Sequence, residues 1–456
     1  MRIQFDRGTL VVDQIVEGAE RAVLDGAAWD PELAAWRLPA SRWAELRVRL
    51  ADVGVRNPSD KVAPGQLEAA WKLPELRWYQ RSAIGAWRAA GERGVIALPT
   101  GTGKTLTAIG AIAALGVATL VLVPTRVLLD QWARALGEAW PFPIGRLGDG
   151  DHVVAPITVA TYASAIGWAP RIGDAFGLVV VDEAHHVGAW CPREVFDMVV
   201  APARLGLTAT PPEPGGALDA AVGPVVYALG IADLIGDALA AFDLETVRAQ
   251  LDAGERETYR TRRGQFNTAY ARFARGRPGA SWREFVAHAS TSRDGRAALA
   301  AWRASRAVLA FPQAKRAAVK ALLARHAGER MLIFTSDNAT AYAIARELLV
   351  NPVTCEIGRR ERAEMLRRFR SGEAPVLVSA QVLDEGLDVP EADVAIVVGG
   401  TASARRHVQR IGRVLRSRLG KRARVYELAT DAELGTVAQR RRGLGHRETA
   451  RREVVS

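Results

Sequence analysis

The residues best suited to chemistry begin with a glycine-rich segment at residues 98–105, which reads LPTGTGKT. Its glycines let the backbone curl so that N–H groups face phosphate oxygens, and the helix expected to follow at residues 106–114 adds its positive dipole end. Lys104 suits the β- and γ-phosphates of a nucleoside triphosphate, and the hydroxyl of Thr105 suits Mg²⁺. The strict pattern has a glycine where Leu98 stands, so this is a variant. The predicted phosphate loop comprises Pro99, Thr100, Gly101, Thr102, Gly103, Lys104 and Thr105.

An acidic pair follows at residues 179–186, VVVDEAHH, where an apolar run ends in two carboxylates. We expect Asp182 to hold Mg²⁺ through its water shell and Glu183 to polarise the water that attacks the γ-phosphate. A metal site at the two histidines is not expected, because consecutive side chains diverge and no third ligand lies nearby in the sequence. We interpret His185 as a coupling residue and His186 as a local hydrogen-bonding or packing residue.

These motifs require strands that deliver them to one edge of a sheet. Short apolar runs alternate with helical patterns in two stretches of the chain, which is typical of parallel sheets covered on both faces. Strands are predicted at residues 95–98, 119–123, 157–160, 178–181 and 204–207, and again at 331–334, 375–378 and 394–398. The motif at 98–105 therefore has the strand, loop and helix order that it requires.

The composition bounds the remaining choices. The chain has 456 residues, 49% of them hydrophobic, and a formal net charge of +11. This charge favours a polyanionic partner such as nucleic acid, although the bias of the cations towards arginine offers a second explanation. Cys191 and Cys355 lack ligand spacing, so neither a disulfide framework nor a cysteine zinc site is expected. The sequence has no apolar run of about 18 residues and no secretory leader, so no membrane association and a cytoplasmic location are expected.

A stretch at residues 241–310 loses the strand pattern and becomes helical, rich in arginine and interspersed with aromatics. Basic side chains among aromatics suit a nucleic-acid backbone with bases beside it. The same pattern fits a helical bundle with aromatics inside and solvated arginines outside. Both interpretations remain open, and they do not exclude each other.

Together the motifs resemble those of superfamily 2 helicases, and most closely those of the XPB family of DNA helicases. The matching segments run in order as LRWYQ at 76–80, VPTRVLLDQW at 123–132, VATY at 159–162, GLTATP at 206–211, LIFTS at 332–336, VSAQVLDEGLDV at 378–389 and QRIGRVLR at 409–416. The resemblance implies an α/β fold with two tandem RecA-like parallel-sheet domains, a small N-terminal α+β module and a helical insert. We divide the chain into a damage-recognition-like module at 1–70, an ATP-binding domain at 71–235, a thumb-like insert at 236–310, a second domain at 311–432 and a basic tail at 433–456.

The resemblance also implies residue roles. Arg77 and Gln80 would read adenine, while Thr208 and Thr210 would join His185 in coupling nucleotide state to strand contact. Catalysis would be completed from the second domain by Gln409, Arg413 and Arg416, with Gly386 and Asp388 near the nucleotide. Nucleic-acid contacts would come from Thr125, Arg126, Thr161, Tyr162, Thr335, Ser336, Ser379 and Gln381.

The implied activity is movement on DNA, or opening of DNA, driven by ATP and Mg²⁺, with 3′ to 5′ polarity and a role in repair. One departure concerns strand opening. The family usually carries an Arg-Glu-Asp triplet after the TAT motif, whereas residues 210–216 here read TPPEPGG. ATP hydrolysis is therefore a safer expectation than strand separation.

The expected partner is single-stranded or forked duplex DNA. An RNA helicase, a duplex translocase that serves a restriction or defence complex, and a nucleotide-gated clamp that recruits a partner nuclease remain as alternatives. Glu183 argues against the clamp, because a clamp has no need of a carboxylate that positions water.

Overall fold

The computed structural model describes residues 2–13, 15, 25–50, 67, 71–211, 213–234, 241–380, 392–399 and 422–437. The chain divides into two compact units, Met1–Gly230 and Ile231–Ser456, and each is described by itself. Within the described residues, no helix is long and apolar enough to cross a membrane.

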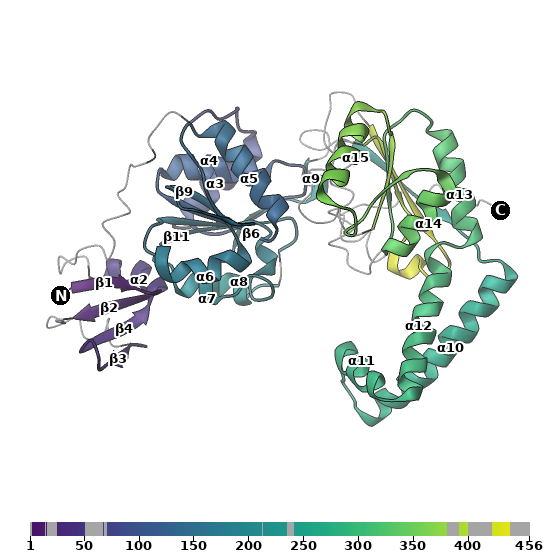
Figure 1. The fold of residues 1–456 in the computed structure, drawn as a ribbon, viewed down its shortest axis with the longest axis horizontal. Coiled ribbons are helices and arrows are strands. Elements are labelled where there is room, and N and C mark those ends of the chain that lie inside the picture. The colour runs from purple at the N-terminus through teal and green to yellow at the C-terminus, as the bar shows by residue number, and fades with distance from the viewer. Residues whose placement is uncertain are drawn as a thin grey trace. The chain divides into compact units, whose positions relative to one another are not determined.

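A small antiparallel sheet opens the first unit, with strand order β1-β2-β4-β3 (Figure 1). Alternate residues of β2 face inward, and Leu10 and Val12 pack there against Trp43 and Leu46. Val200, from the following domain, completes this core. The elements are β1 (Arg2–Asp6), β2 (Thr9–Asp13), β3 (Ala28–Asp30), β4 (Ala35–Pro39), the 3-10 helix η1 (Ala40–Arg42) and α2 (Trp43–Arg49).

The remainder of the first unit is built on a sheet of order β12-β5-β11-β10-β6-β9-β7-β8, in which only the β7–β8 pair is antiparallel. Helices α3, α4 and α5 lie on one face, and α6, α7 and α8 on the other (Figure 1). The elements are α3 (Trp78–Ala89), β5 (Arg93–Ala97), α4 (Lys104–Leu115), β6 (Thr119–Val123), α5 (Arg126–Ala139), β7 (Gly145–Gly148), β8 (Asp151–Val153), β9 (Ile157–Thr161), α6 (Tyr162–Ile172), β10 (Leu178–Val181), the 3-10 helix η3 (Ala184–His186), α7 (Glu194–Asp197), β11 (Ala203–Thr208), α8 (Ala217–Ala221) and β12 (Val225–Ala228).

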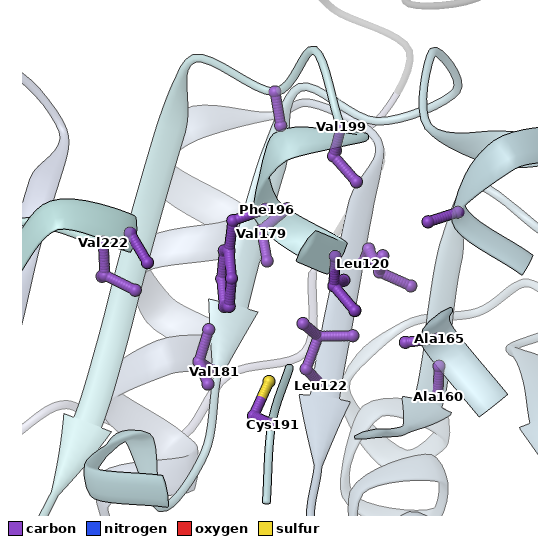
Figure 2. Close-up of a cluster of buried hydrophobic side chains, with 14 of the residues drawn as sticks. Leu120, Leu122, Ala160, Ala165, Val179, Val181, Cys191, Phe196, Val199 and Val222 are labelled. Carbon is purple, nitrogen blue, oxygen red and sulfur yellow. The ribbon is translucent and has the colours of Figure 1, made fainter. Parts of the chain in front are cut away.

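Burial on both faces explains why these strands are apolar runs without alternation. Every residue of β6, β9 and β10 is buried. Figure 2 shows Leu120 and Leu122 of β6 beside Val179 and Val181 of β10, with Phe196 and Cys191 in the same cluster. Burial raises the pKa of the Cys191 thiol to about 12, so this cysteine is a packing residue and not a reactive one.

The second unit is centred on a parallel sheet of order β13-β18-β17-β14-β16-β15. Its core includes Phe311, Val319 and Leu322 from the helical side and Ile333, Val378 and Ile396 from the strands. The elements are α9 (Ile231–Leu234), β13 (Ala241–Arg248), α10 (Ala253–Gly276), α11 (Trp282–Thr291), α12 (Arg293–Ala310), α13 (Gln313–Arg325), β14 (Met331–Phe334), α14 (Asn338–Leu348), β15 (Asn351–Val353), α15 (Arg359–Ser371), β16 (Val376–Ser379), β17 (Val394–Val397) and β18 (Arg422–Ala429).

Two of the predicted domain boundaries need correction. The insert was expected to begin at residue 236, but Ala241–Arg248 forms β13, which pairs in parallel with β18 of the second sheet. The inserted helices begin at Ala253. At the other end, Glu433 was assigned to the tail, yet its carboxylate accepts a 2.8 Å hydrogen bond from the buried ammonium of Lys315. Residues up to 437 therefore belong to the second unit, and the tail after them lies outside the described residues.

The insert is a three-helix bundle with its own core, in which α10 packs against α12 (Figure 1). Phe266, Phe273 and Phe285 are buried there with Ala289 and Leu299. The three phenylalanines therefore face inward, as the bundle interpretation predicted, whereas Trp282 is partly exposed. The arginines of this stretch lie on the outside of the bundle: Arg263 is half-buried, and the exposed ones are Arg260, Arg262, Arg272, Arg275, Arg277 and Arg283.

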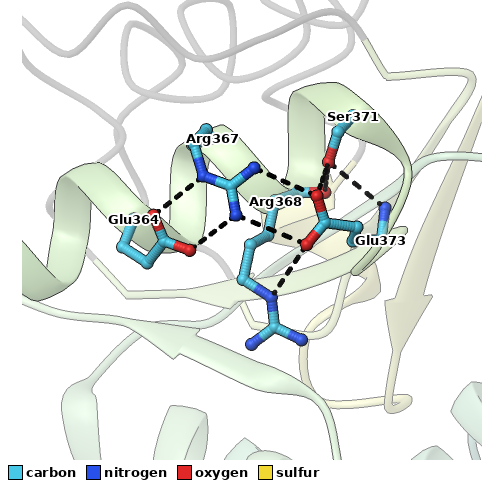
Figure 3. A network of polar contacts seen from close by, with 5 residues as sticks. All are labelled: Glu364, Arg367, Arg368, Ser371 and Glu373. Atoms are coloured by element: carbon cyan, nitrogen blue, oxygen red, sulfur yellow. Dashed lines mark hydrogen bonds and ion pairs between the residues drawn. The ribbon is translucent and has the colours of Figure 1, made fainter.

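Helix α15 ends in a network of charged side chains (Figure 3). The guanidinium of Arg367 contacts both Glu364 at 2.7 Å and Glu373 at 3.0 Å, and Ser371 donates to Glu373 at 2.8 Å. Gly372 ends the helix with a left-handed φ of 82°. These exposed pairs hold the turn but contribute little stability, because water screens them.

We predict that Phe285→Ala unfolds the insert locally. The Phe285 ring lies 5.0 Å from that of Tyr270 and 5.3 Å from that of Phe273, so its removal should cost this core about 3–5 kcal/mol. Hydrogen exchange should accelerate in α10–α12 and stay unchanged in β14. Tyr259→Ala, at a half-buried tyrosine of α10, is the control. Equal exchange in the two variants would contradict the assignment of this core.

Candidate functional site

The site lies at the carboxyl ends of three neighbouring strands, β5, β11 and β10. In the register of the sheet, Ala97 pairs with Thr208, and Gly206 pairs with Val181. The phosphate loop, the TAT segment and the acidic pair each follow directly from one of these strands. The carboxyl edge of an open parallel sheet is where such folds bind ligands.

The phosphate loop turns through left-handed glycines, with φ of 87° at Gly101 and 78° at Gly103. Gly103 is the N-cap of α4, which begins at Lys104, two residues before the predicted helix start at Leu106. Leu98 has no positive φ, so nothing in the backbone requires the glycine of the strict pattern at this position. Instead, the Leu98 N–H donates to the Thr208 carbonyl at 3.0 Å, and the Leu98 carbonyl accepts from the ammonium of Lys104 at 3.3 Å.

Residues from the start of α3 form hydrogen bonds to the backbone of this loop. Gln80 is buried, and its amide nitrogen lies 3.2 Å from the carbonyl of Thr102 and 3.3 Å from that of Gly103. Its amide oxygen accepts from the backbone N–H of Arg77 at 2.8 Å. The Tyr79 hydroxyl donates to the Thr102 carbonyl at 2.6 Å. Gln80 therefore ties the loop to the helix in this structure, whereas its role in reading adenine stays a prediction.

Asp182 is a buried carboxylate at the end of β10. Burial raises its pKa, and three groups oppose that rise: the indole N–H of Trp132 at 2.8 Å, the charge of Lys104 and the N–H of Glu183 at 2.9 Å. A buried carboxylate without partners would be strongly disfavoured. The lysine of the phosphate loop and the acidic pair are thus coupled electrostatically.

Glu183 occupies a strained left-handed conformation, with φ of 49° and ψ of 46°. Such a conformation in a residue other than glycine costs on the order of 1–3 kcal/mol and persists only where its surroundings impose it. Tyr162 donates its hydroxyl to the carbonyl of Asp182, and the His186 N–H donates to the carbonyl of Glu183 at 3.0 Å. Burial raises the pKa of Tyr162 well above its usual value, so this hydroxyl stays protonated and remains a donor.

His185, Thr208 and Thr210, the three predicted coupling residues, form one network. Nδ1 of His185 lies 3.0 Å from the hydroxyl of Thr208 and 3.4 Å from the carboxylate of Glu183. The same hydroxyl donates to the Thr210 carbonyl at 3.1 Å and accepts from the Thr210 N–H at 3.1 Å. Because the only proton of that hydroxyl points at a carbonyl, the network assigns the Nδ1 proton to His185. His185 therefore connects Glu183 to the TAT segment through side-chain contacts.

His186 has the local packing role that the sequence predicted. Its ring stacks on Trp190 with 4.1 Å between centroids. Burial lowers its pKa, so the ring is neutral at pH 7.

The predicted nucleic-acid contacts are only partly placed on the surface. Arg126 is exposed, with an ion pair to Asp149 at 2.9 Å, and Thr125 and Ser336 are half-buried. The other described members have buried side chains that serve the fold, which differs from the expectation. Thr161 caps α6, Tyr162 supports the acidic turn, and Thr335 and Ser379 donate to backbone carbonyls.

Several predicted site residues lie outside the described residues. They are Gln381, Gly386, Asp388, Gln409, Arg413 and Arg416. Their roles stay predictions.

Trp132 is a functional side chain that sequence reasoning did not single out. It lies within the segment 123–132, and its indole donates to the acidic pair. The available signal was a tryptophan on the apolar face of α5, since a buried indole N–H needs an acceptor.

Three family models match successive parts of the chain. They are the xeroderma pigmentosum group B helicase damage recognition domain over residues 3–57, the res subunit of type III restriction enzymes over 73–213, and the helicase conserved C-terminal domain over 314–418.

Similar proteins agree with these matches. The DNA 3′-5′ translocase XPB2 of Sulfurisphaera tokodaii is 33% identical over 92% of this chain and 96% of its own length. The putative DNA 3′-5′ helicase Rad25 of Halobacterium salinarum is 30% identical over 87% of this chain, which spans 61% of that relative. Among solved structures, the Pyrococcus furiosus Hef helicase domain aligns with a TM-score of 0.52 at 20% identity, over 80% of this chain and 98% of its own, which supports the fold alone.

We predict that the bond from Trp132 to Asp182 is stronger than that of an ordinary buried indole. Trp132→Phe should lower the free energy of unfolding by about 1 kcal/mol more than Trp87→Phe, because its acceptor is a carboxylate. Trp87 is the matched control, since its buried indole donates at 3.0 Å to the neutral carbonyl of Arg204. Chemical denaturation measures both variants. Equal losses would show that the carboxylate acceptor does not strengthen this hydrogen bond.

Proposed function

This chain belongs to the XPB-type family of superfamily 2 helicases, and on that premise we propose that it is an ATP-dependent DNA helicase or translocase. It would couple ATP hydrolysis to movement along DNA, or to opening of DNA, in DNA repair. The proposed 3′ to 5′ polarity follows the names of the relatives in Sulfurisphaera tokodaii and Halobacterium salinarum.

One observation carries the proposal. Lys104 and the adjacent pair Asp182 and Glu183 come from two separate segments of the chain and converge at the carboxyl ends of neighbouring parallel strands. A phosphate-binding lysine beside a buried carboxylate, with a second carboxylate held in a strained turn, is the arrangement that hydrolysis of a nucleoside triphosphate needs. A protein that only binds nucleotide does not need the strained Glu183.

The residues present fit Mg²⁺ bound with the nucleotide. Buried carboxylate oxygen and a threonine hydroxyl are hard donors of the kind that Mg²⁺ prefers, and burial of Asp182 favours a nearby cation. Asp182 and Thr105 would hold the ion, which would supply charge stabilisation for the phosphates. Lys104 would neutralise phosphate oxygens, and Glu183 would orient the attacking water.

The coupling network gives this hydrolysis a route to mechanical work. A change at Glu183 would reach Thr208 and Thr210 through His185, because these side chains are already in contact. Gln409, Arg413 and Arg416 of the second unit are proposed to complete the charge stabilisation. Closure of the two domains on each cycle would then move the bound strand.

The two alternative enzymes, an RNA helicase and a duplex translocase, correspond to specific outcomes of the tests below. A duplex translocase is the second candidate, because the triplet associated with strand opening is absent from residues 210–216. A partner nuclease would then supply any cutting.

We predict that Lys104→Ala and Glu183→Gln abolish ATP turnover while leaving DNA binding largely intact. The loss should be at least about 10²-fold in kcat, as expected when a preorganised charge or a water-positioning group is removed. Steady-state phosphate release and a DNA-binding titration measure the two effects. Lys72→Ala and Glu138→Gln, at exposed residues of the same domain, are the matched controls. Full turnover in either site variant would refute the site.

We predict further that strand displacement distinguishes an unwinding enzyme from a translocase. Substrates with a 3′ tail, a 5′ tail or blunt ends are compared with ATP and with a non-hydrolysable analogue. A 3′ to 5′ helicase is expected to displace the strand of the 3′-tailed substrate with ATP and not with the non-hydrolysable analogue. ATP turnover stimulated by duplex, without displacement, would identify a translocase. Stimulation by RNA alone would overturn the assignment to DNA.

A further inference from the structure

An exposed tryptophan, Trp190, lies seven residues after the strained Glu183 and stacks on the ring of His186. Trp190 is 56% exposed, and its ring lies parallel to that of His186, with 4.1 Å between centroids and 8° between planes. The His186 ring in turn lies 4.0 Å from that of His185. An exposed aromatic that stacks this closely on a half-buried neighbour is not a loose surface side chain.

The loop that carries Trp190 is fixed by its own backbone. The carbonyl of His186 accepts N–H groups from Ala189, Trp190 and Cys191, each at 3.0 Å, and Gly188 donates back to the carbonyl of Cys191 at 2.9 Å. A Cβ added at Gly188 would lie 2.7 Å from that of Ala217 in α8. The backbone of this turn therefore fixes the position of Trp190 relative to His186.

His185, whose ring lies beside that of His186, belongs to the candidate site. His185 contacts both Glu183 and the hydroxyl of Thr208 through the same ring nitrogen. Any rotation of His185 would break one of these contacts. The ring of His186 lies beside that of His185, with 4.0 Å between centroids, and Trp190 stacks on His186.

We propose that Trp190 is a positioning residue for ATP hydrolysis: stacked on His186, it holds His185 in place between Glu183 and Thr208. This inference rests on the proposed function. Trp190 lies outside the phosphate loop and the acidic pair and contacts His186, so we expect it to act on the turnover step through Glu183 and not on ATP binding. Small displacements of positioned groups can cost large factors in rate.

Two substitutions separate this role from general packing. Trp190→Ala removes the stack, whereas Trp190→Phe keeps a flat ring over His186. We expect Trp190→Ala to lower kcat about tenfold with KM for ATP changed less than about twofold, and Trp190→Phe to keep at least about half of the parent's kcat. Phe142→Ala removes another exposed aromatic from the same domain and should leave kcat unchanged. An unchanged kcat in Trp190→Ala, or losses as large in Trp190→Phe, would overturn the proposal.

A spectroscopic measurement tests the same idea without removing the ring. The chain is labelled with 5-fluorotryptophan, and the resonance of Trp190 is assigned by its loss in Trp190→Phe. We expect this resonance to shift when a non-hydrolysable ATP analogue and Mg²⁺ bind, and to stay in place in Lys104→Ala. A resonance that ignores nucleotide would overturn the proposal even if Trp190→Ala failed to fold. A parent without turnover would instead refute the proposed function, and the fluorine response would still decide this inference.

Discussion

Burial of the negative charge on Asp182 is the constraint on which the rest of the site depends. A carboxylate removed from water is tolerated only where donors and opposite charge replace its hydration. Trp132 supplies an indole N–H from α5, and Lys104 supplies a cation from the start of α4. The carboxylate of Asp182 thus holds the start of α4 and the middle of α5 against the end of β10.

The parallel sheet makes this arrangement possible because it brings strand ends to a common edge. β11 lies between β5 and β10, so Thr208 at its end reaches both neighbours. Its backbone carbonyl accepts from Leu98, directly before the phosphate loop, and its hydroxyl contacts His185 of the acidic segment. A single threonine therefore touches the three motifs, and the geometry follows from strand order more than from any one side chain.

Much of this architecture could be predicted from the sequence, because buried parallel strands are continuous apolar runs. The strands at 119–123, 178–181 and 331–334 match the prediction residue for residue, and the α/β fold is confirmed. β13 was missed because it lies at the edge of its sheet and its apolar residues are interrupted by Asp243 and Glu245. Short strands such as β15 carry too few residues to give a pattern.

The site was predictable where chemistry dictates residue type, and less so where a side chain serves the backbone. Lys104, Asp182 and Glu183 are identified by charge in a defined context. Tyr162 and Trp132 act by donating to groups that only the folded chain brings near them. The family resemblance implied a nucleic-acid contact at Tyr162, but its phenol instead donates to the backbone carbonyl of Asp182, next to the strained Glu183.

The insert shows how packing narrows the kinds of nucleic-acid contact that it can make. Phe266, Phe273 and Phe285 are consumed in its own core, and Arg277 lies over the ring of Phe273 at 5.7 Å. Trp282 is 43% exposed, but its ring packs 5.1 Å from that of Trp302. The outer face therefore presents mainly guanidinium groups, which attract phosphates without reading bases. A strand held by this face would be bound through its backbone, with an affinity that falls steeply as salt rises and with little preference for sequence. Such a grip suits a protein that must release and rebind DNA of any sequence as it moves.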